Sequence, residues 1–170
     1  MFGATRHAGA VQNGPVSSPG VFRAATVHAE LVGCLLFDFN TEFDAPGPAA
    51  EEFARRFASL LERDDVIVLV AGSEQDPTGF AYLTLRPTPY YDGPLAQLEE
   101  LYVRPALRDR GIGTALLQEA VRRVREHRGG EIHINVDEVD TATRRFYERH
   151  GFVNIEPGAD YRMLCYLREL

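Results

Sequence analysis

The chain has 170 residues, of which 45% are hydrophobic and 25% are charged, and it carries a formal net charge of −7 at pH 7. This length and composition are ordinary for one soluble domain with a sizeable core. The acidic balance argues against broad nucleic-acid binding, and no apolar run reaches the roughly 20 residues of a membrane span. The N-terminus lacks the pattern of a signal peptide, so we expect a cytoplasmic protein without a nucleic-acid or membrane partner.

Local composition predicts the domain limits and the state of the cysteines. Residues 1–20 are rich in Gly, Ala, Ser and Pro without periodicity, which predicts a flexible leader before a single domain over residues 21–170. Cys34 and Cys165 stand far apart among apolar neighbours, which favours buried free thiols over a disulfide. The five histidines lack metal-ligand spacing, so we expect no metal site.

Periodicity predicts the elements of the first half of the chain. Apolar residues at helical spacing indicate two helices, and turn residues between them indicate a loop. A continuous β-branched run is typical of a strand covered on both faces, and the alternating stretch after it predicts a hairpin partner. The expected elements are strand 21–27, helix 28–39, loop 40–48, helix 49–62, strand 66–71 and strand 79–86.

The second half of the chain continues with strands separated by helices. An apolar run, 98–103, leads into a basic, glycine-bearing turn that opens a helix with one apolar face. The other expected elements are helix 111–128, strand 131–136, helix 141–150, and strands 152–155 and 161–168. This order predicts a three-layer α/β fold with a central mixed sheet flanked by helices.

The turn 108–113 has the chemistry of an anion site. The start of a helix carries unpaired N–H groups and a partial positive charge, and phosphates bind there for that reason. Gly111 and Gly113 lack a Cβ, so an anion can approach the backbone, and Arg108 and Arg110 add donors suited to phosphate. The spacing Arg-x-x-Gly-x-Gly matches neither a Walker A loop nor a Rossmann fingerprint, and alone it is equally compatible with an ordinary helix start.

Two stretches together resemble a known family. Residues 97–117, QLEELYVRPALRDRGIGTALL, resemble motif A of the GNAT superfamily of N-acetyltransferases, and Asp140–Phe152 resembles its motif B. The resemblance covers residues 21–170, and Leu98–Val103 with Pro105 is most similar to the diamine (spermidine/spermine) acetyltransferases. It implies the GNAT fold, acetyl-CoA as co-substrate and acetyl transfer to an amine. Homodimers are common in the family, so the resemblance also raises a homodimer as an expectation.

The resemblance implies roles for individual residues. The turn would cradle the diphosphate of acetyl-CoA, Leu101 and Val103 would bond the pantetheine arm through their main chain, and an N–H near Tyr102 or Val103 would stabilise the oxyanion. Asp140 replaces the usual Asn of the family and lacks its amide donors, but it can still cap the helix. The implied cofactor-binding residues are Leu101, Tyr102, Val103, Arg108, Asp109, Arg110, Gly111, Ile112, Gly113, Thr114 and Asp140.

The candidate catalytic residues are Glu99, Glu100 and Tyr147. An alkylamine is almost fully protonated at neutral pH, so a carboxylate is needed to accept its proton. Successive strand side chains face opposite sides, so at most one glutamate enters the site unless a bulge redirects the other. By resemblance to the diamine enzymes, Glu99 would remove the proton and Glu100 would hold a cationic substrate, although these roles could be swapped. The resemblance makes Tyr147 the proton donor to the CoA sulfur.

We therefore expect an N-acetyltransferase that transfers an acetyl group to a primary amine, of a small molecule, by direct attack in a ternary complex. The loop 40–48 is expected to border the acceptor site, and the acidic residues Asp137 and Glu138 favour an amine. Three alternatives remain open. They are a protein or peptide acceptor, which exposed Tyr90 and Tyr91 would suit, a non-catalytic acyl-CoA-binding sensor, and a phosphate-binding domain for another nucleotide.

Overall fold

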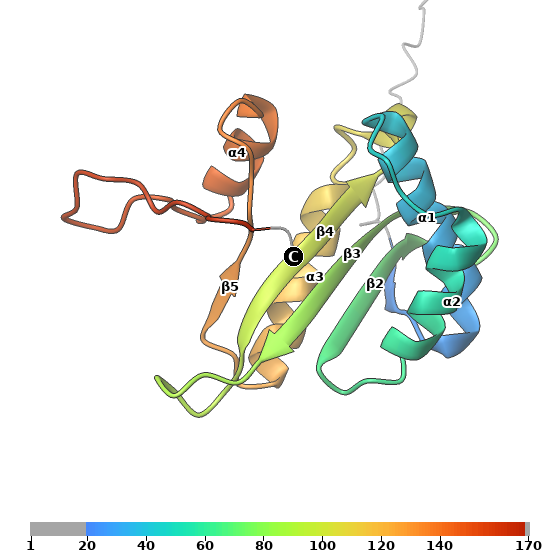
Figure 1. Cartoon of the computed structure of the whole chain (residues 1–170), viewed down its shortest axis with the longest axis horizontal. Coiled ribbons are helices and arrows are strands. Elements are labelled where there is room, and N and C mark those ends of the chain that lie inside the picture. Colours follow the sequence, from blue (N-terminus) through green and yellow to red (C-terminus); the bar gives the residue numbers. More distant parts are fainter. Residues whose placement is uncertain (1–19, 169–170) are drawn as a thin grey trace, which may run out of the picture.

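The computed structural model describes residues 20–168, so the leader predicted over residues 1–20 lies almost entirely outside the described residues. The elements follow the predicted order as far as α4 (Figure 1). Short 3₁₀ turns lie at Thr26–His28 and Pro105–Leu107. The strands and helices are β1 (Val21–Arg23), α1 (Ala29–Glu42), α2 (Ala50–Leu60), β2 (Val66–Gly72), β3 (Pro77–Arg86), β4 (Leu95–Val103), α3 (Ile112–Glu126), β5 (Glu131–His133) and α4 (Thr141–Glu148).

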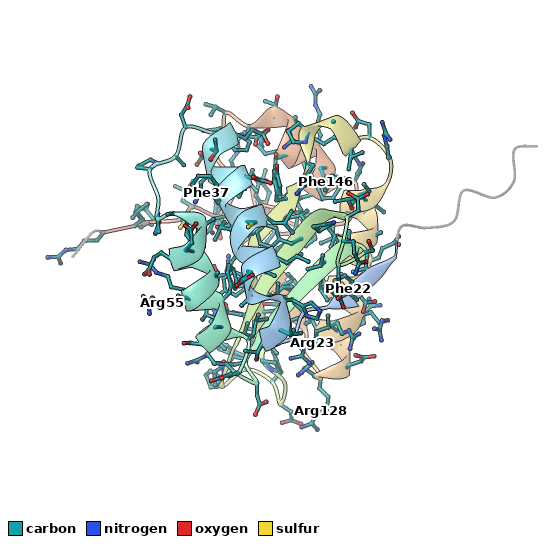
Figure 2. The ribbon with its side chains drawn as sticks, turned by 90° about the vertical axis from the view of Figure 1, so that its right-hand side faces the viewer. Phe22, Arg23, Phe37, Arg55, Arg128 and Phe146 are labelled. Atoms are coloured by element: carbon teal, nitrogen blue, oxygen red, sulfur yellow. The ribbon has the colours of Figure 1, made fainter. Side chains whose placement is uncertain are left out.

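One sheet of five strands, in the order β1-β2-β3-β4-β5, runs through the molecule. The first four strands are antiparallel neighbours, and β5 lies parallel to β4. Helices α1 and α2 cover one face of the sheet, as the view in Figure 2 shows, and α3 covers the other. The predicted three-layer α/β fold with a mixed sheet is therefore confirmed.

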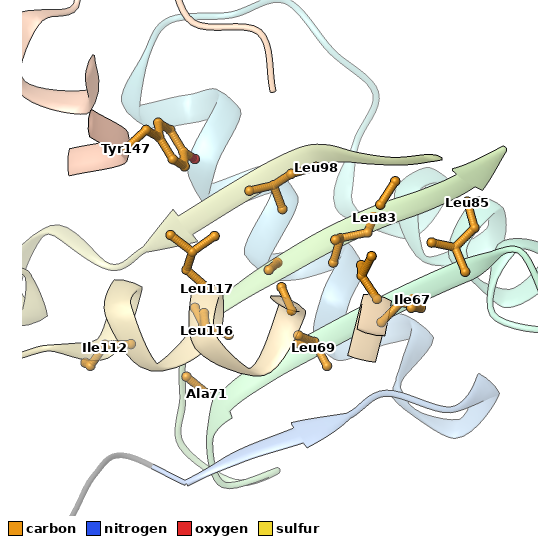
Figure 3. Close-up of a cluster of buried hydrophobic side chains, with 14 residues drawn as sticks. Ile67, Leu69, Ala71, Leu83, Leu85, Leu98, Ile112, Leu116, Leu117 and Tyr147 are labelled. Carbon is orange, nitrogen blue, oxygen red and sulfur yellow. The ribbon is translucent and has the colours of Figure 1, made fainter. Parts of the chain in front are cut away.

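Strand β2 forms the centre of the core. Its residues Val66–Ala71 are all buried, as the continuous β-branched run predicts. Odd-numbered side chains of the strand join a cluster around α3 (Figure 3), and even-numbered ones join a second cluster beneath α1 and α2. Because both faces are covered, this part of the sheet gives a rigid support for the neighbouring β4.

Four predicted strands are shorter than expected or absent. β1 ends at Arg23 because residues Thr26–His28 form a 3₁₀ turn, whose His28 Nδ1 accepts from the Ala25 N–H at 2.8 Å. β5 ends at His133, where its pairing with β4 stops. The predicted strands 152–155 and 161–168 do not form, because that segment has no sheet partner and its side chains are mostly exposed.

The cysteine prediction is half right. Cys34 and Cys165 are both free thiols, but both are exposed rather than buried. Cys34 lies on α1, whose buried side consists of other residues, and Cys165 lies in the C-terminal segment that failed to join the sheet. Among the helices of residues 20–168, none has both the length and the apolar character needed to cross a bilayer.

Candidate active site

A bulge in β4 brings two carboxylates to one face of the sheet. The register of β3 against β4 shifts between Tyr82 and Leu83, which leaves Glu99 as the extra residue. Glu100 lies opposite Tyr82, whose side chain packs on the α1 and α2 side. Glu99 accepts a hydrogen bond of 2.5 Å from the Thr84 hydroxyl, and Thr84 shares the face of Tyr82 because side chains alternate along a strand. Both glutamates therefore face the same layer.

The two carboxylates differ in their surroundings. Glu99 is exposed, whereas Glu100 is half-buried. Burial, and secondly the charge of Glu99, raise the pKa of Glu100 to about 7. At neutral pH the Glu100 carboxyl is therefore divided between its protonated and ionised forms, which is the condition of an effective general base.

β4 parts from β5 close to these carboxylates. The parallel pairing is limited to Leu95–Gln97 against Glu131–His133, after which the two strands diverge (Figure 1). From Leu98 onward, the β5-facing edge of β4 has no strand partner within residues 20–168. The main-chain groups along this edge are therefore available to an extended ligand.

The turn after β4 ends in an open helix N-terminus. The first helical hydrogen bond of α3 joins the Ala115 N–H to the Gly111 carbonyl at 2.9 Å. The amides of Ile112, Gly113 and Thr114 precede this bond and have no acceptor within the helix. Gly111 has φ +79°, and a Cβ there would meet nothing within 4 Å, so its glycine is required by conformation rather than by space.

The basic residues of the turn have different surroundings. Arg108 donates to Glu42 of α1 at 2.7 Å and to the Val103 carbonyl at 3.1 Å. Asp109 and Arg110 are exposed, and Asp109 adopts φ +59°. The Arg108 side chain, predicted to hold phosphate, here ties the turn to α1. The amides of the helix start are the groups that remain directed at an anion.

An acidic group lies at the C-terminal end of α1. Tyr102 is buried against Phe39, with ring centroids 5.3 Å apart. Burial, followed by the charges of Asp38 and Glu42, raises the pKa of the Tyr102 phenol. Asp38 also lies 3.6 Å from Arg104. The end of α1 therefore lies beside the end of β4, and the expectation that loop 40–48 borders the acceptor site stays a prediction.

Helix α4 is held against the N-terminus of α3. A Cβ on Gly113 would lie 3.4 Å from the Phe146 ring, at van der Waals contact, so Gly113 lies directly against α4. His150 Nδ1 lies 2.7 Å from the Phe146 carbonyl, and its Nε2 lies 3.1 Å from Thr114 Oγ1. Because a carbonyl can only accept, Nδ1 carries a proton, and Nε2 completes the link to the Thr114 hydroxyl. His150 thus links the two helices that flank the turn.

Tyr147 projects from α4 into the core edge beside β4 (Figure 3). Only 5% of it is exposed, and its ring packs 5.3 Å from that of Phe152. Burial, followed by the charges of Glu100 and Asp140, raises the pKa of the Tyr147 phenol. The phenol therefore keeps its proton throughout the neutral range and can act as a proton donor.

The acidic loop before α4 has local roles. Asp140 caps the helix, as predicted, by accepting from the Thr143 N–H at 3.0 Å. This backbone hydrogen bond is the main cause that lowers the pKa of Asp140. Glu138 forms an ion pair with Arg162, and Asp137 is exposed. Asp140 is thus engaged with its own helix, and its contact with a cofactor stays a prediction.

The aromatic loop between β3 and β4 lies at the opposite end of β4 from the turn (Figure 1). Tyr90 is exposed, but the Tyr91 hydroxyl donates to Glu131 at 3.2 Å and its ring lies beside Gly130. Tyr90 is therefore exposed, as the peptide alternative supposes, whereas Tyr91 is partly buried. A peptide acceptor bound beside these tyrosines stays a prediction.

Sequence reasoning missed the residues that support the site from other elements. Thr84, Asp38, Glu42 and His150 each lie far along the chain from the residue they contact or influence. The one local signal was polar character on an otherwise apolar strand or helix, as at Thr84 on β3. Residues 20–168 contain no cluster of three or more His, Cys, Asp or Glu that could hold a metal ion.

Comparison with known proteins gives one family. The model of the acetyltransferase (GNAT) family matches residues 30–152. No curated protein matches the chain. A solved structure from Arthrobacter sp. FB24, of a protein provisionally assigned as an acetyltransferase, is 47% identical to this chain with a TM-score of 0.85. The alignment covers 93% of this chain and 100% of that one.

Two more distant structures share the fold. An aminoglycoside acetyltransferase from an uncultured soil metagenomic sample is 22% identical, with a TM-score of 0.74 over 91% of this chain and 98% of that one. A ribosomal-protein-alanine N-acetyltransferase from Brucella melitensis biovar Abortus 2308 is 20% identical, with a TM-score of 0.70 over 89% and 99% of the two chains. Their acceptors differ in kind, so a likeness at this level concerns the fold alone.

Proposed function

Since the chain belongs to the acetyltransferase (GNAT) family, we propose that it transfers an acetyl group from acetyl-CoA to a primary amine of a small cationic molecule. The observation that carries this proposal is the bulge in β4. It aligns Glu99 and Glu100 on one face of the sheet, and burial beside Glu99 brings the pKa of Glu100 to about 7. An amine acetyltransferase needs such a base, whereas a sensor that only binds acyl-CoA does not.

The donor would bind on the α3 and α4 side of β4. The amides of Ile112, Gly113 and Thr114 would hold its diphosphate, helped by the positive end of the helix and by Arg110. The pantetheine arm would follow the open edge of β4, where Leu101 and Val103 offer main-chain groups. This arrangement would leave the thioester near Tyr147 on the same side of the sheet.

The acceptor would approach from the α1 and α2 side. Glu99 and Glu100 face that layer, and the divergence of β4 from β5 leaves an opening in the sheet through which amine and thioester would meet. Asp38 and Glu42 at the end of α1 are paired with Arg104 and Arg108, so Glu99 and Glu100 are the carboxylates left to meet the acceptor. Two carboxylates beside one opening favour a cationic acceptor, since their charges attract it and hold it in place.

Three side chains would take part in the reaction. Glu100 would accept a proton from the ammonium of the bound amine, because a carboxylate with a pKa near 7 still takes up a proton at neutral pH. Glu99, held by Thr84, would keep its negative charge toward the substrate. The neutral amine then forms the N–C bond as the C–S bond breaks, and Tyr147 would give its proton to the departing sulfur. The proton that the new amide nitrogen loses would pass through water to solvent, from which the Tyr147 phenolate would regain its own. These assignments reverse the glutamate roles that the diamine resemblance implies.

The test is an assay of thiol release from acetyl-CoA with a panel of diamines, polyamines, aminoglycosides, amino acids and peptides bearing a free N-terminus. We expect turnover with at least one small amine carrying two or more positive charges, and little with peptides. Turnover with peptides alone would mean that the acceptor is a peptide and not a small cationic amine. The absence of turnover with every amine, in protein that binds acetyl-CoA in a calorimeter, would favour the non-catalytic sensor instead.

A further inference from the structure

Two ion pairs tie the C-terminal end of α1 to the segment between β4 and α3. Asp38 lies 3.6 Å from Arg104, and Glu42, about one helical turn further on, accepts a hydrogen bond of 2.7 Å from Arg108. The two arginines stand on either side of the 3₁₀ turn Pro105–Leu107, and Figure 1 shows the end of α1 beside the end of β4. These contacts join a helix on the acceptor side of the sheet to the turn that would hold the donor.

The same carboxylates act on a phenol that belongs to the acceptor face. Tyr102 follows Glu100 by two residues on β4, so their side chains share one face of the sheet. Burial first, and then the charges of Asp38 and Glu42, raise the pKa of Tyr102, and the charges of the two paired arginines oppose them. The charge at the end of α1 is therefore felt on the face from which the amine would approach.

Arg108 is held in a way that leaves its pairing open to exchange. Its Nε donates to the Val103 carbonyl at 3.1 Å, which keeps the guanidinium beside the turn, while a terminal nitrogen reaches Glu42. The Arg108 side chain is 42% exposed, and an ion pair as exposed as this one contributes little to stability. A small movement of one nitrogen is therefore enough to release Glu42.

A diphosphate bound at the start of α3 would be a strong competitor for this arginine. Arg108 precedes Gly111, the residue that caps the helix, by only three positions. A diphosphate carries a negative charge on each phosphoryl group, against one on Glu42, and guanidinium forks suit phosphate oxygens. Arg104 differs, because it belongs to the end of β4, before the 3₁₀ turn, and its Nε is buried.

We propose that Glu42 and the diphosphate of acetyl-CoA compete for Arg108, so that donor binding frees the Glu42 carboxylate on the acceptor side of the sheet. This inference rests on the proposed function for the identity of both substrates. Without the donor, Arg108 offsets the charge of Glu42. With the donor bound, Glu42 adds its charge to those of Glu99 and Glu100 and strengthens the binding of a cationic acceptor. Glu42 is thus a positioning residue that couples the two substrates.

The first test is calorimetric titration of coenzyme A into the wild type and into Glu42→Gln, without any amine. Removing the competitor should lower the Kd of coenzyme A by about 2- to 5-fold, the range in which an exposed ion pair affects an equilibrium. Asp38→Asn is the matched control, since it removes the same charge one turn earlier on α1, and its Kd should change far less. A Kd that is unchanged or higher in Glu42→Gln would mean that the ion pair only braces the turn, and would overturn the proposal.

The second test separates competition for Arg108 from simple repulsion between Glu42 and phosphate. Arg108→Gln should itself weaken coenzyme A binding, and adding Glu42→Gln to it should then bring no gain, because the shared partner is gone. Repulsion alone would give the same gain in both backgrounds, and that result would refute the competition. Circular dichroism of each variant establishes that it is folded.

The third test measures the coupling with an amine that the wild type acetylates. Saturating coenzyme A should lower the Kd of the amine more in the wild type than in Glu42→Gln, by about 2- to 5-fold, and the amine should change the Kd of coenzyme A by the same factor. Equal coupling in both proteins would show that Glu42 has no part in it. If no amine is acetylated, the proposed function fails, whereas the titrations with coenzyme A alone still decide whether Glu42 competes for Arg108.

Discussion

The centre of the sheet and its β5 end differ in how completely their residues are covered. β2 is buried on both faces and pairs along its length with β3, whereas β4 and β5 pair over three residues and then separate. The half-buried Glu100, the buried phenol of Tyr147 and the open start of α3 all lie toward the second region. The comparison indicates that one half of the sheet supplies stability, and that groups which are costly to bury are placed where the other half opens.

The largest effect should come from the proposed base. Glu100→Gln keeps the shape of the side chain and removes the proton acceptor, so kcat/KM should fall by about 10²- to 10⁴-fold. In the wild type, kcat/KM should rise with pH through about 7, because only the ionised Glu100 can accept a proton. In the variant this inflection should disappear. A pH–rate profile of both proteins checks the prediction, and a variant that retains the inflection would assign it to another group.

A cavity beside β2, in the covered half of the sheet, should lower the free energy of unfolding more than a cavity beside β5, at the open end. Leu69→Ala removes a fully buried side chain between the layers, and we expect a loss of about 2–5 kcal/mol in the free energy of unfolding. Ile132→Ala on β5 is the matched comparison and should cost about 1 kcal/mol, because Ile132 is only partly buried. Urea denaturation measures both values. Equal losses would remove the distinction between the two halves of the sheet.

The raised pKa of Glu100 should also make the free energy of unfolding depend on pH. Its folded pKa, about 7, lies above the usual value of 4.5, so the folded state binds the extra proton between these values. The stability from this group is therefore present below about pH 4.5 and is lost as the pH rises through 7. Discounted for partial exposure, the loss should amount to about 1–2 kcal/mol. Glu100→Gln should lack this decline when unfolding is compared at pH 5 and pH 8, and identical pH slopes would contradict it.

The smallest effect should come from the neighbouring carboxylate. Glu99→Gln removes a negative charge that raises the pKa of Glu100, so the inflection of the pH–rate profile should move to lower pH by less than about one unit. Thr84→Val, which removes the hydroxyl bonded to Glu99, should leave the charge in place and the inflection nearly unchanged. A shift toward higher pH in Glu99→Gln would mean that the two carboxylates do not interact as described.

Much of the fold could be predicted because its signals are local. The β-branched run of β2, the apolar face of α3 and the capping Asp140 depend on spacing within a few residues, and each lies where the pattern predicted. The prediction of strands over residues 152–155 and 161–168 failed because a strand needs a partner, and apolar alternation in residues 161–168 does not specify which edge supplies it. The exposure of Cys165 follows from the same error.

The candidate site likewise has some features that local sequence signals identify and others that they do not. The sequence identified Glu99, Glu100 and Tyr147 as candidates, but it could not assign their pKa values, which depend on burial and on charges from other elements. Strand alternation indicated that only a bulge could direct both glutamates into the site, and the register shift between β3 and β4 is that bulge. The link of Arg108 to Glu42 spans 66 residues and has no local signal. Long-range side-chain contacts are the part that spacing alone does not encode.

The most direct test of the central claim is a crystal structure of the protein with coenzyme A and an amine that it acetylates. We predict the diphosphate on the amides of Ile112, Gly113 and Thr114, the sulfur beside the Tyr147 hydroxyl, and the amine nitrogen within hydrogen-bonding reach of Glu100 or of one bridging water. Coenzyme A bound elsewhere, or an amine on the far side of β4 from both glutamates, would contradict it.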